Sequence, residues 1–227
     1  MLRALRELNL TNPVAFYRAL RNAAITVWDP TRSDIQGGIQ TLVYDALRKA
    51  PPKQVADLAA ASPALVSLFE AGYDPVLDPE RLERLPDGTL GREYARFIRA
   101  NGLTPLETLL AMPPATNVLE YLFRRAYKLH DVLHVAIGAD ASVLGEVRVV
   151  SYTIGQSRRQ GHAAPLALAV LWVNIALRRP YEMPEAIALA AEWLERGRSA
   201  RWHVTTPLED WLEKPVPEVR EALLAPA

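Results

Sequence analysis

Apolar positions recur along most of this chain at the three- and four-residue spacing of amphipathic helices. Between residues 53 and 71 the apolar side chains at positions 55, 58, 65, 68 and 69 follow this spacing, which predicts one or two short helices. Only the segment 147–152 is rich enough in β-branched residues to compete as a strand, and it follows a strongly helical context. The pattern therefore predicts an all-α protein that folds as a multi-helix bundle.

Capping and helix-breaking residues divide the chain into segments. Amphipathic N-terminal helices are expected within residues 1–28, with a break at Asn12-Pro13, and a further helix over 33–49 that ends before Pro51-Pro52. Residues 72–92 are rich in glycine and proline and predict a loop. The other helices are expected at 91–100, 117–137, 142–160, 163–178 and 184–197, followed by a tail of mixed character over 203–227.

The size and composition predict one domain over residues 1–227. The chain has 227 residues, half of them hydrophobic, which is ample for one core. The longest uncharged run covers residues 163–177, whereas a membrane-spanning helix needs roughly 20 residues. We therefore expect this run to form a buried or lipid-facing helix rather than a membrane anchor.

Charge and cysteine content exclude several classes of function. The 26 basic and 26 acidic residues balance, so the chain has no electrostatic footprint for nucleic acid. It has no cysteine, which excludes disulfides, thiolate metal sites and cysteine nucleophiles. No signal peptide is recognisable, and a cytoplasmic protein is expected.

The strongest candidate for chemistry is a pair of histidines with a carboxylate between them. His130, Asp131 and His134 lie within five residues, and they include two of the chain's four histidines. On a helix, positions i and i+4 lie about 40° apart and position i+1 lies about 100° away, so the three side chains share one broad face. Two imidazoles and a carboxylate on one face are suitable ligands for a divalent cation.

Glu146 is the predicted fourth ligand. Gly138 is a natural end for the histidine helix, and Asp140 or Ser142 can cap a new helix that carries Glu146 in its first turn. A helical hairpin would then return this carboxylate to the histidines. Such a cluster can also be an ordinary polar helix face, but its neighbours are apolar, and buried ionisable groups are rare unless they are paired or bind metal.

Basic residues near this hairpin predict a cationic rim for a carboxylate or a lipid head group. Arg124 and Lys128 precede the histidine helix, and Arg158 lies near the end of the next one. The alternative is that these residues are solvated helix-end charges with no role in binding. Both interpretations are open from the sequence.

Two motifs together resemble those of the coenzyme Q (ubiquinone) biosynthesis protein 4 family. The spacing of His130, Asp131, His134 and Glu146 matches the H-D-x-x-H, eleven residues, E signature of that family. Residues 85–94 read L-P-D-G-T-L-G-R-E-Y, which is similar to a second block of the family, and residues 29–34 resemble a third. After the glutamate the chain departs from the usual pattern, because residues 149–154 read V-V-S-Y-T-I.

The resemblance implies an all-α fold in which the side chains of His130, Asp131, His134 and Glu146 bind a divalent metal, usually zinc. From the donor types alone, iron, manganese or cobalt would also fit. It implies a role on prenylated ring precursors of ubiquinone, at the step where the ring carboxyl group is lost. It also implies contact with other quinone-biosynthesis proteins at a membrane surface. That surface is the inner membrane, approached from the bacterial cytoplasm or inside the mitochondrion. We further expect a homodimer.

Two functions are compatible with these expectations. The first is a metal-dependent lyase that decarboxylates a prenylated 4-hydroxybenzoate-type precursor, with the four predicted ligands as its catalytic residues. The second is a non-catalytic scaffold that binds prenyl lipid and has a structural metal. A phosphohydrolase of the His-Asp type would need an earlier histidine, and none precedes His130. A zincin-like protease would need a glutamate base where Asp131 stands.

Overall fold

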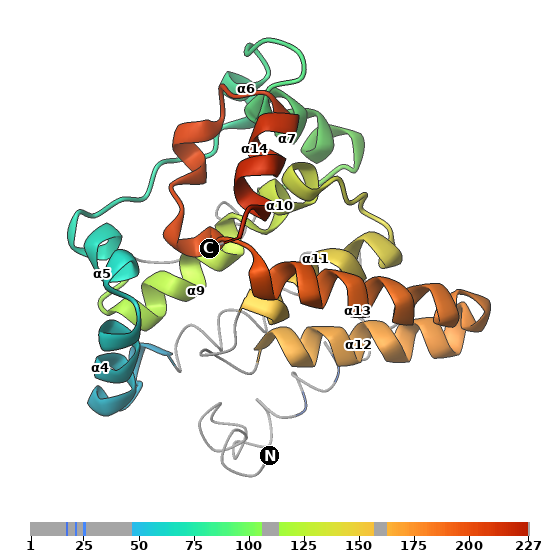
Figure 1. Cartoon of the computed structure of the whole chain (residues 1–227), viewed down its shortest axis with the longest axis horizontal. Helices are drawn as coiled ribbons and strands as arrows, with labels where there is room; N and C mark the ends of the chain where they lie inside the picture. The colour runs from blue at the N-terminus through green and yellow to red at the C-terminus, as the bar shows by residue number, and fades with distance from the viewer. Residues whose placement is uncertain are drawn as a thin grey trace. The chain divides into compact units, whose positions relative to one another are not determined.

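The computed structural model describes residues 17, 21, 25, 47–105, 114–156 and 163–226, with the backbone alone for 163–167. Every regular element in these ranges is a helix, as predicted (Figure 1). The α-helices are α4 (Pro52–Ala61), α5 (Pro63–Glu70), α6 (Pro79–Leu82), α7 (Leu90–Ala100), α9 (Val118–Lys128), α10 (His130–Ile137), α11 (Val143–Gln156), α12 (Ala163–Arg178), α13 (Met183–Ser199) and α14 (Val216–Leu224). Three short 3₁₀ turns are η1 (Pro180–Glu182), η2 (His203–Thr205) and η3 (Leu208–Trp211).

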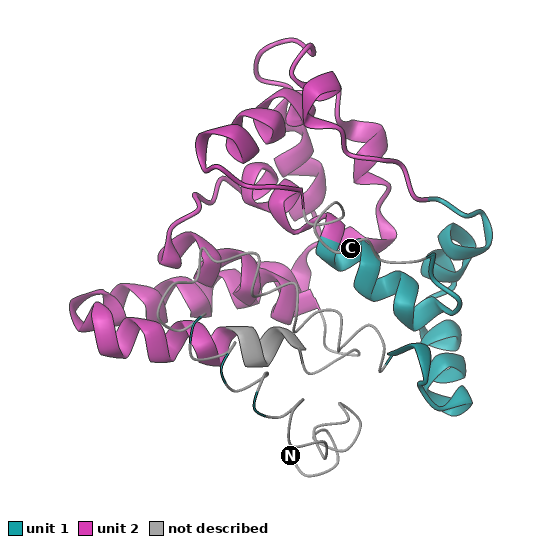
Figure 2. Ribbon diagram, turned by 180° about the vertical axis from the view of Figure 1, so that it is seen from behind, with its two compact units in different colours: residues 1–73, 106–127 teal, residues 74–105, 128–227 magenta. Residues whose placement is uncertain are grey.

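The chain groups into two compact units, shown in two colours in Figure 2. Unit 1 contains residues 1–73 and 106–127, and unit 2 contains residues 74–105 and 128–227. The single domain expected over residues 1–227 stays a prediction. The N-terminal helices expected within residues 1–28 lie outside the described residues, apart from three helical positions.

Unit 1 is held together by buried polar contacts as well as by apolar packing. Arg125 is fully buried, and its guanidinium lies 5.2 Å from the ring centre of Tyr73 and 5.9 Å from that of Tyr121. The carboxylate of Glu120, also fully buried, accepts a hydrogen bond from Arg48 Nε at 3.0 Å. Cation–π contact and ion pairing therefore make buried charges tolerable in this unit.

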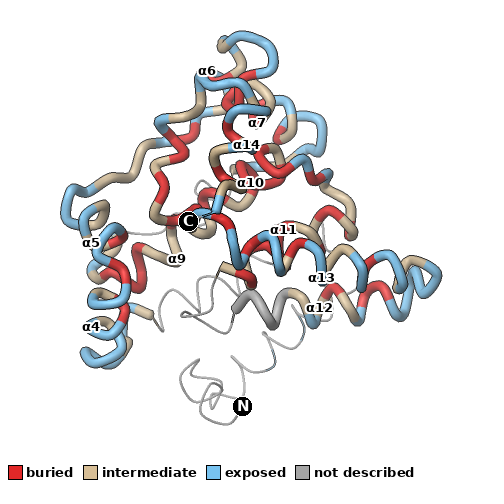
Figure 3. The backbone as a smooth tube through the Cα atoms, in the orientation of Figure 1, coloured by how far each residue is buried: buried red, intermediate tan, exposed pale blue. Residues whose placement is uncertain are grey.

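Unit 2 has a core formed by α7, α10 and α14, which contact one another around a common set of buried side chains. These include Leu90, Tyr94, Leu133, Val219 and Leu223, and buried stretches of all three helices are red in Figure 3. The residues expected to form a tail thus contribute a helix to the core, because Val219 and Leu223 in α14 are fully buried.

Helices α11, α12 and α13 form a second packed group in unit 2, with α11 beside both others (Figure 1). Two glycines let α11 and α13 cross closely. A Cβ atom on Gly155 would lie 2.2 Å from the carbonyl oxygen of Leu194, and one on Gly197 would lie 2.1 Å from that of Tyr152. Among the described residues, no helix combines the length and the apolar character needed to cross a bilayer.

The segment at residues 85–94 holds the C-terminal part of the chain against α7. The backbone N–H of Gly91 donates to the carbonyl of Leu212 at 2.8 Å, and that of Leu90 donates to Lys214 at 2.9 Å. Position 91 is closely packed, because a Cβ atom there would lie 2.7 Å from Leu85 Cδ1 and 3.1 Å from the carbonyl oxygen of Leu212. This motif therefore orients α7, which presents Phe97 to the cluster described below.

The helix predicted at 117–137 is two helices, α9 and α10, with a break at Leu129. The predicted end of α10 is confirmed, because Gly138 has the left-handed backbone conformation (φ 76°) that glycine adopts most readily. Arg220 of α14 donates from Nε to the carbonyl of Ala136 at 2.9 Å. A cation at the C-terminal end of a helix hydrogen-bonds a terminal carbonyl and interacts favourably with the helix dipole. Arg220 therefore helps α14 to fix the position of α10.

Candidate metal centre

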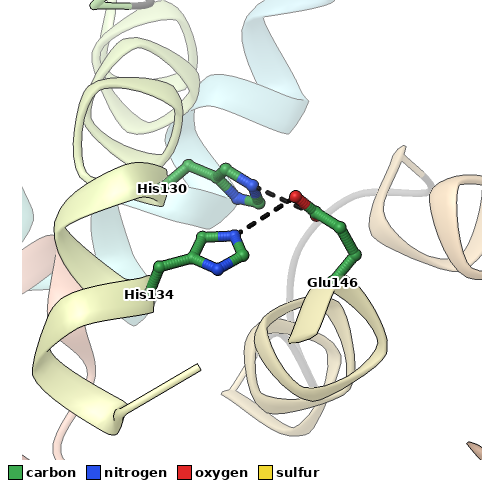
Figure 4. Close-up of side chains that lie close together, drawn as sticks. All are labelled: His130, His134 and Glu146. Atoms are coloured by element: carbon green, nitrogen blue, oxygen red, sulfur yellow. Dashed lines mark ion pairs between the residues drawn. The ribbon is translucent and has the colours of Figure 1, made fainter. Parts of the chain in front are cut away.

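Three of the four predicted ligands meet between α10 and α11. His130 and His134 lie one helical turn apart on α10, and Glu146 extends toward both from the first turn of α11 (Figure 4). The Nε2 atoms of His130 and His134 lie 3.4 Å and 3.2 Å from the two carboxylate oxygens of Glu146. One donor atom from each residue lies within 4.8 Å of the others, so one ion could be bound by all three.

The hairpin forms for the reasons that the sequence suggested. Of the two candidate caps, Ser142 is the one that serves α11, because its hydroxyl accepts a hydrogen bond from the N–H of Gly145 at 3.1 Å. Asp140 in turn accepts hydrogen bonds from Ser142. The cap sets where α11 begins, and so places Glu146 opposite the histidines.

Asp131, the fourth predicted ligand, is not a member of the three-donor group. It follows His130 on α10 and is 8 % exposed, so it lies beside the cluster in buried surroundings. Burial raises the pKa of its carboxyl group, the charge of Glu146 raises that pKa further, and the two histidines oppose both effects. The structure thus supports a His-His-Glu set, with Asp131 next to it.

Charge coupling within the group shifts two pKa values in opposite directions. Burial alone lowers the pKa of His130, but the charge and hydrogen bond of Glu146, together with the charge of Asp131, raise it to about 9. Burial favours the neutral acid at Glu146, yet its interactions with His130 and His134 hold the pKa of this carboxyl well below its usual range. In the metal-free protein His130 is therefore protonated at neutral pH, and its positive charge balances the Glu146 carboxylate as a bound metal ion would.

The ring of His134 is held by two groups outside the predicted site. Its Nδ1 atom lies 2.9 Å from the carbonyl oxygen of Asp140, and the ring of Phe97 stacks on it with centres 5.2 Å apart. The sequence predicts Asp140 only as a helix cap. No sequence signal pointed to Phe97, because its contact depends on how α7 packs against α10.

The three side chains differ in their access to solvent. The side chains of His130 and Glu146 are 28 % and 29 % exposed, whereas that of His134 is 1 % exposed. An ion held here would have one buried ligand and two ligands at an accessible edge. The group is therefore open on one side.

The structure places the three residues predicted to form a cationic rim in different surroundings. Lys128 does not fit that role, because its side chain is 1 % exposed and its ammonium contacts Asp74 and Glu209 of unit 2 at 2.7 Å and 2.9 Å. Arg124 is half-buried in α9 and belongs to unit 1, so its role at the cluster stays a prediction. Arg158 lies outside the described residues.

A comparison with protein families identifies the chain's relatives. A family model described as "Coenzyme Q (ubiquinone) biosynthesis protein Coq4" matches residues 74–225, which include all three donors of the cluster. The chain belongs to the Coq4 family. The resemblance found in the sequence motifs is thus confirmed, and the chain is a ubiquinone biosynthesis protein by family.

Individual relatives agree with this assignment. The mitochondrial ubiquinone biosynthesis protein COQ4 homolog of Danio rerio is 31 % identical over 65 % of this chain, which spans 53 % of that protein. The homolog of Rattus norvegicus is 27 % identical over 88 % of this chain and 74 % of its own length. A crystal structure of a Nostoc punctiforme protein, provisionally assigned to ubiquinone biosynthesis, matches 91 % of this chain and 96 % of its own with a TM-score of 0.65. At 21 % identity, this last likeness establishes a shared fold.

Metal uptake by this Coq4 family member should depend steeply on pH. Because His130 has a pKa of about 9 in the metal-free protein, an incoming ion must displace its proton at neutral pH. The affinity should rise by about tenfold for each pH unit between pH 6 and pH 9 and level off above. Calorimetry in buffers of different ionisation enthalpy should count about one proton released for each ion bound at pH 7. An affinity that does not change over this range would refute the ion-pair assignment.

Proposed function

We propose that the chain is a metal-dependent decarboxylase of ubiquinone biosynthesis that acts on a prenylated 4-hydroxybenzoate-type ring precursor. The observation that supports this is the composition and openness of the cluster. Catalytic zinc sites commonly have three protein ligands, including two histidines and a glutamate, and keep a position for water or substrate, whereas structural sites are closed by four ligands. Among the described residues, the group of His130, His134 and Glu146 has three donors and is partly exposed, which matches the catalytic pattern.

His130, His134 and Glu146 would hold the divalent cation, for which zinc is the first expectation and iron, manganese or cobalt suit the same donors. A bound cation would supply Lewis-acid stabilisation of the negative charge that develops as the carboxyl group leaves. In the reaction, the bond between ring carbon one and the carboxyl carbon breaks and carbon dioxide departs. The bonding electrons stay on the ring, and a proton from solvent takes the vacated position.

The protein side chains around the cluster have separate roles in this proposal. The stacked ring of Phe97 excludes water from one face of His134, and the accessible edge at His130 and Glu146 admits the ring carboxylate. If oxygen is installed at the same ring carbon, the step also needs a two-electron oxidant, for which we propose dioxygen. A redox-active metal or a partner enzyme is then also needed, because zinc has no redox chemistry.

Partners and location extend the same proposal. Prenylated precursors partition into membranes, so we propose peripheral contact with the inner membrane and contact with other quinone-biosynthesis proteins. The relatives described above are named mitochondrial, and a bacterial chain would meet the membrane from the cytoplasm. A homodimer is part of the proposal, and analytical ultracentrifugation of the full chain would test it.

The test is a product assay with a defined substrate. Metal-loaded full-length protein is incubated with a 3-prenyl-4-hydroxybenzoate, in air and without oxygen, and carbon dioxide and ring products are measured by mass spectrometry. We expect carbon dioxide and one decarboxylated ring product in equal amounts, and neither from metal-stripped protein or from Glu146→Gln. If the metal-loaded protein binds the substrate but releases no carbon dioxide under either atmosphere, the scaffold function replaces the decarboxylase function.

A further inference from the structure

The connecting loop between α10 and α11 (residues 138–142) determines which nitrogen of His134 faces the cluster. A backbone carbonyl can only accept a hydrogen bond, so the 2.9 Å contact between His134 Nδ1 and the Asp140 oxygen requires the hydrogen on Nδ1. With Nδ1 engaged in this way, Nε2, which faces Glu146 at 3.2 Å, is the nitrogen left to coordinate an ion held between the two residues. The Asp140 carbonyl thus selects the tautomer of His134 that can bind a metal ion.

Hydrogen bonds at both ends hold this carbonyl in place. On the α10 side, the N–H of Ala139 donates to the carbonyl of His134 at 2.7 Å. On the α11 side, Asp140 Oδ1 accepts from the Ser142 hydroxyl at 2.6 Å and from the Ser142 N–H at 3.2 Å. The Ser142 hydroxyl in turn accepts from the N–H of Gly145, so the loop is fastened to the first turn of α11.

Gly145 leaves the space that the Asp140 carbonyl occupies. A Cβ atom at position 145 would lie 2.0 Å from the carbonyl oxygen of Asp140 and 2.4 Å from its Oδ1 atom. The residue lies inside α11 and is not one of the described glycines with positive φ, so backbone conformation does not require glycine here. Steric room for the Asp140 carbonyl, rather than backbone conformation, is therefore what glycine provides at this position.

We propose that Gly145 is a positioning residue for the metal centre. It acts through the Asp140 carbonyl, which fixes the orientation and the tautomer of His134, while Glu146, the next residue along the helix, supplies the carboxylate. One turn of α11 therefore sets both an imidazole and a carboxylate of the cluster. This inference rests on the proposed metal binding, but its effect on the tautomer is independent of any ion.

The decisive variant is Gly145→Ala in the full chain, because the added methyl group must displace the Asp140 carbonyl. We expect Zn²⁺ affinity, measured by competition with a chelator, to fall by about 10- to 100-fold, the usual effect of losing the outer partner of a ligating histidine. In the metal-free protein at a pH where the ring is neutral, ¹⁵N NMR should show His134 protonated at Nδ1. In Gly145→Ala the Nδ1–H population should decrease.

Three further variants separate positioning from packing. Gly197→Ala is the same substitution at an equally crowded helical glycine of unit 2, where the atom met is the Tyr152 carbonyl. It should lower stability but leave the Zn²⁺ affinity of folded protein and the His134 tautomer unchanged. Ser142→Ala should weaken Zn²⁺ binding, and Ser142→Thr, which keeps the hydroxyl group, should restore it. The serine pair decides the question if Gly145→Ala does not fold.

Two results would overturn the inference that Gly145 positions His134. Normal Zn²⁺ affinity and a normal tautomer in folded Gly145→Ala, or in Ser142→Ala if the glycine variant is lost, would overturn the inference. Equal losses of affinity in Gly145→Ala and Gly197→Ala would overturn it as well, because they would show a general packing effect. If the wild-type chain binds no Zn²⁺, the proposed metal function fails, while the NMR comparison still decides whether Gly145 controls the tautomer.

Discussion

Replacing Glu146 by glutamine should remove metal binding from this protein with little loss of fold. The side chain keeps its shape but no longer has the charge that contacts both imidazoles at 3.4 Å and 3.2 Å. Loss of a direct ligand should cost more than the roughly 10- to 100-fold that loss of an outer partner costs. Elemental analysis of dialysed protein should find less than a tenth of the wild-type metal content, while circular dichroism and the urea midpoint should show a folded chain.

Asp131→Asn is the matched comparison, because it makes the same carboxylate-to-amide change at the neighbouring acidic residue. The family resemblance implies that Asp131 is a ligand, whereas the structure brings together His130, His134 and Glu146 without it. We therefore expect Asp131→Asn to retain most of the bound metal. If this variant loses the ion as completely as Glu146→Gln does, Asp131 is a fourth ligand, and the site is closed rather than open.

The hairpin that holds the cluster could be predicted because its signals are local. The spacing of His130 and His134 places both on one helix face, Gly138 ends the helix, and Ser142 caps the next one. Each of these effects depends on residues within about one turn of one another. Glu146 then reaches the histidines because a short connection between helices returns the chain antiparallel.

The contacts that could not be predicted are those between distant parts of the chain. Phe97 reaches His134 because α7 packs against α10, and residues 85–94 also hold α7 against the C-terminal segment. No glycine or proline marks the break at Leu129, so the spacing of apolar residues in α9 and α10 predicts a single helix. Arg220 caps α10 from α14, and no pattern in either segment indicates this.

The surroundings of Lys128, which do not fit the predicted rim role, could not be foreseen for a related reason. A lysine beside a candidate site is normally solvent-exposed, and sequence alone gives no sign that acidic partners will surround it. In the structure its ammonium group makes three contacts within unit 2: Asp74 Oδ1 at 2.7 Å, the Pro75 carbonyl at 2.8 Å and Glu209 Oε1 at 2.9 Å. All three donors of the lysine are thereby engaged, and η3 is tied to the residue that lies two positions before α10.

Lys128→Met should therefore act on stability rather than on substrate binding. The Lys128 and Glu209 side chains are 1 % and 0 % exposed, and breaking a buried pair by removing one partner typically costs about 3–5 kcal/mol. Urea unfolding should show a loss of this size. Lys214→Met is the matched control in unit 2, because Lys214 and Glu218 form an exposed pair four residues apart, and its loss should not exceed about 1 kcal/mol.

The double variant Lys128→Met with Glu209→Leu tests the cause of this loss. A buried apolar pair avoids the desolvation cost of the carboxylate, so the double variant should be more stable than Lys128→Met alone. A rim role for Lys128 makes the opposite prediction: normal stability in the single variant, with weaker binding of a prenylated benzoate. Unfolding free energies within about 1 kcal/mol of wild type for Lys128→Met would favour that role and contradict the buried ion pair.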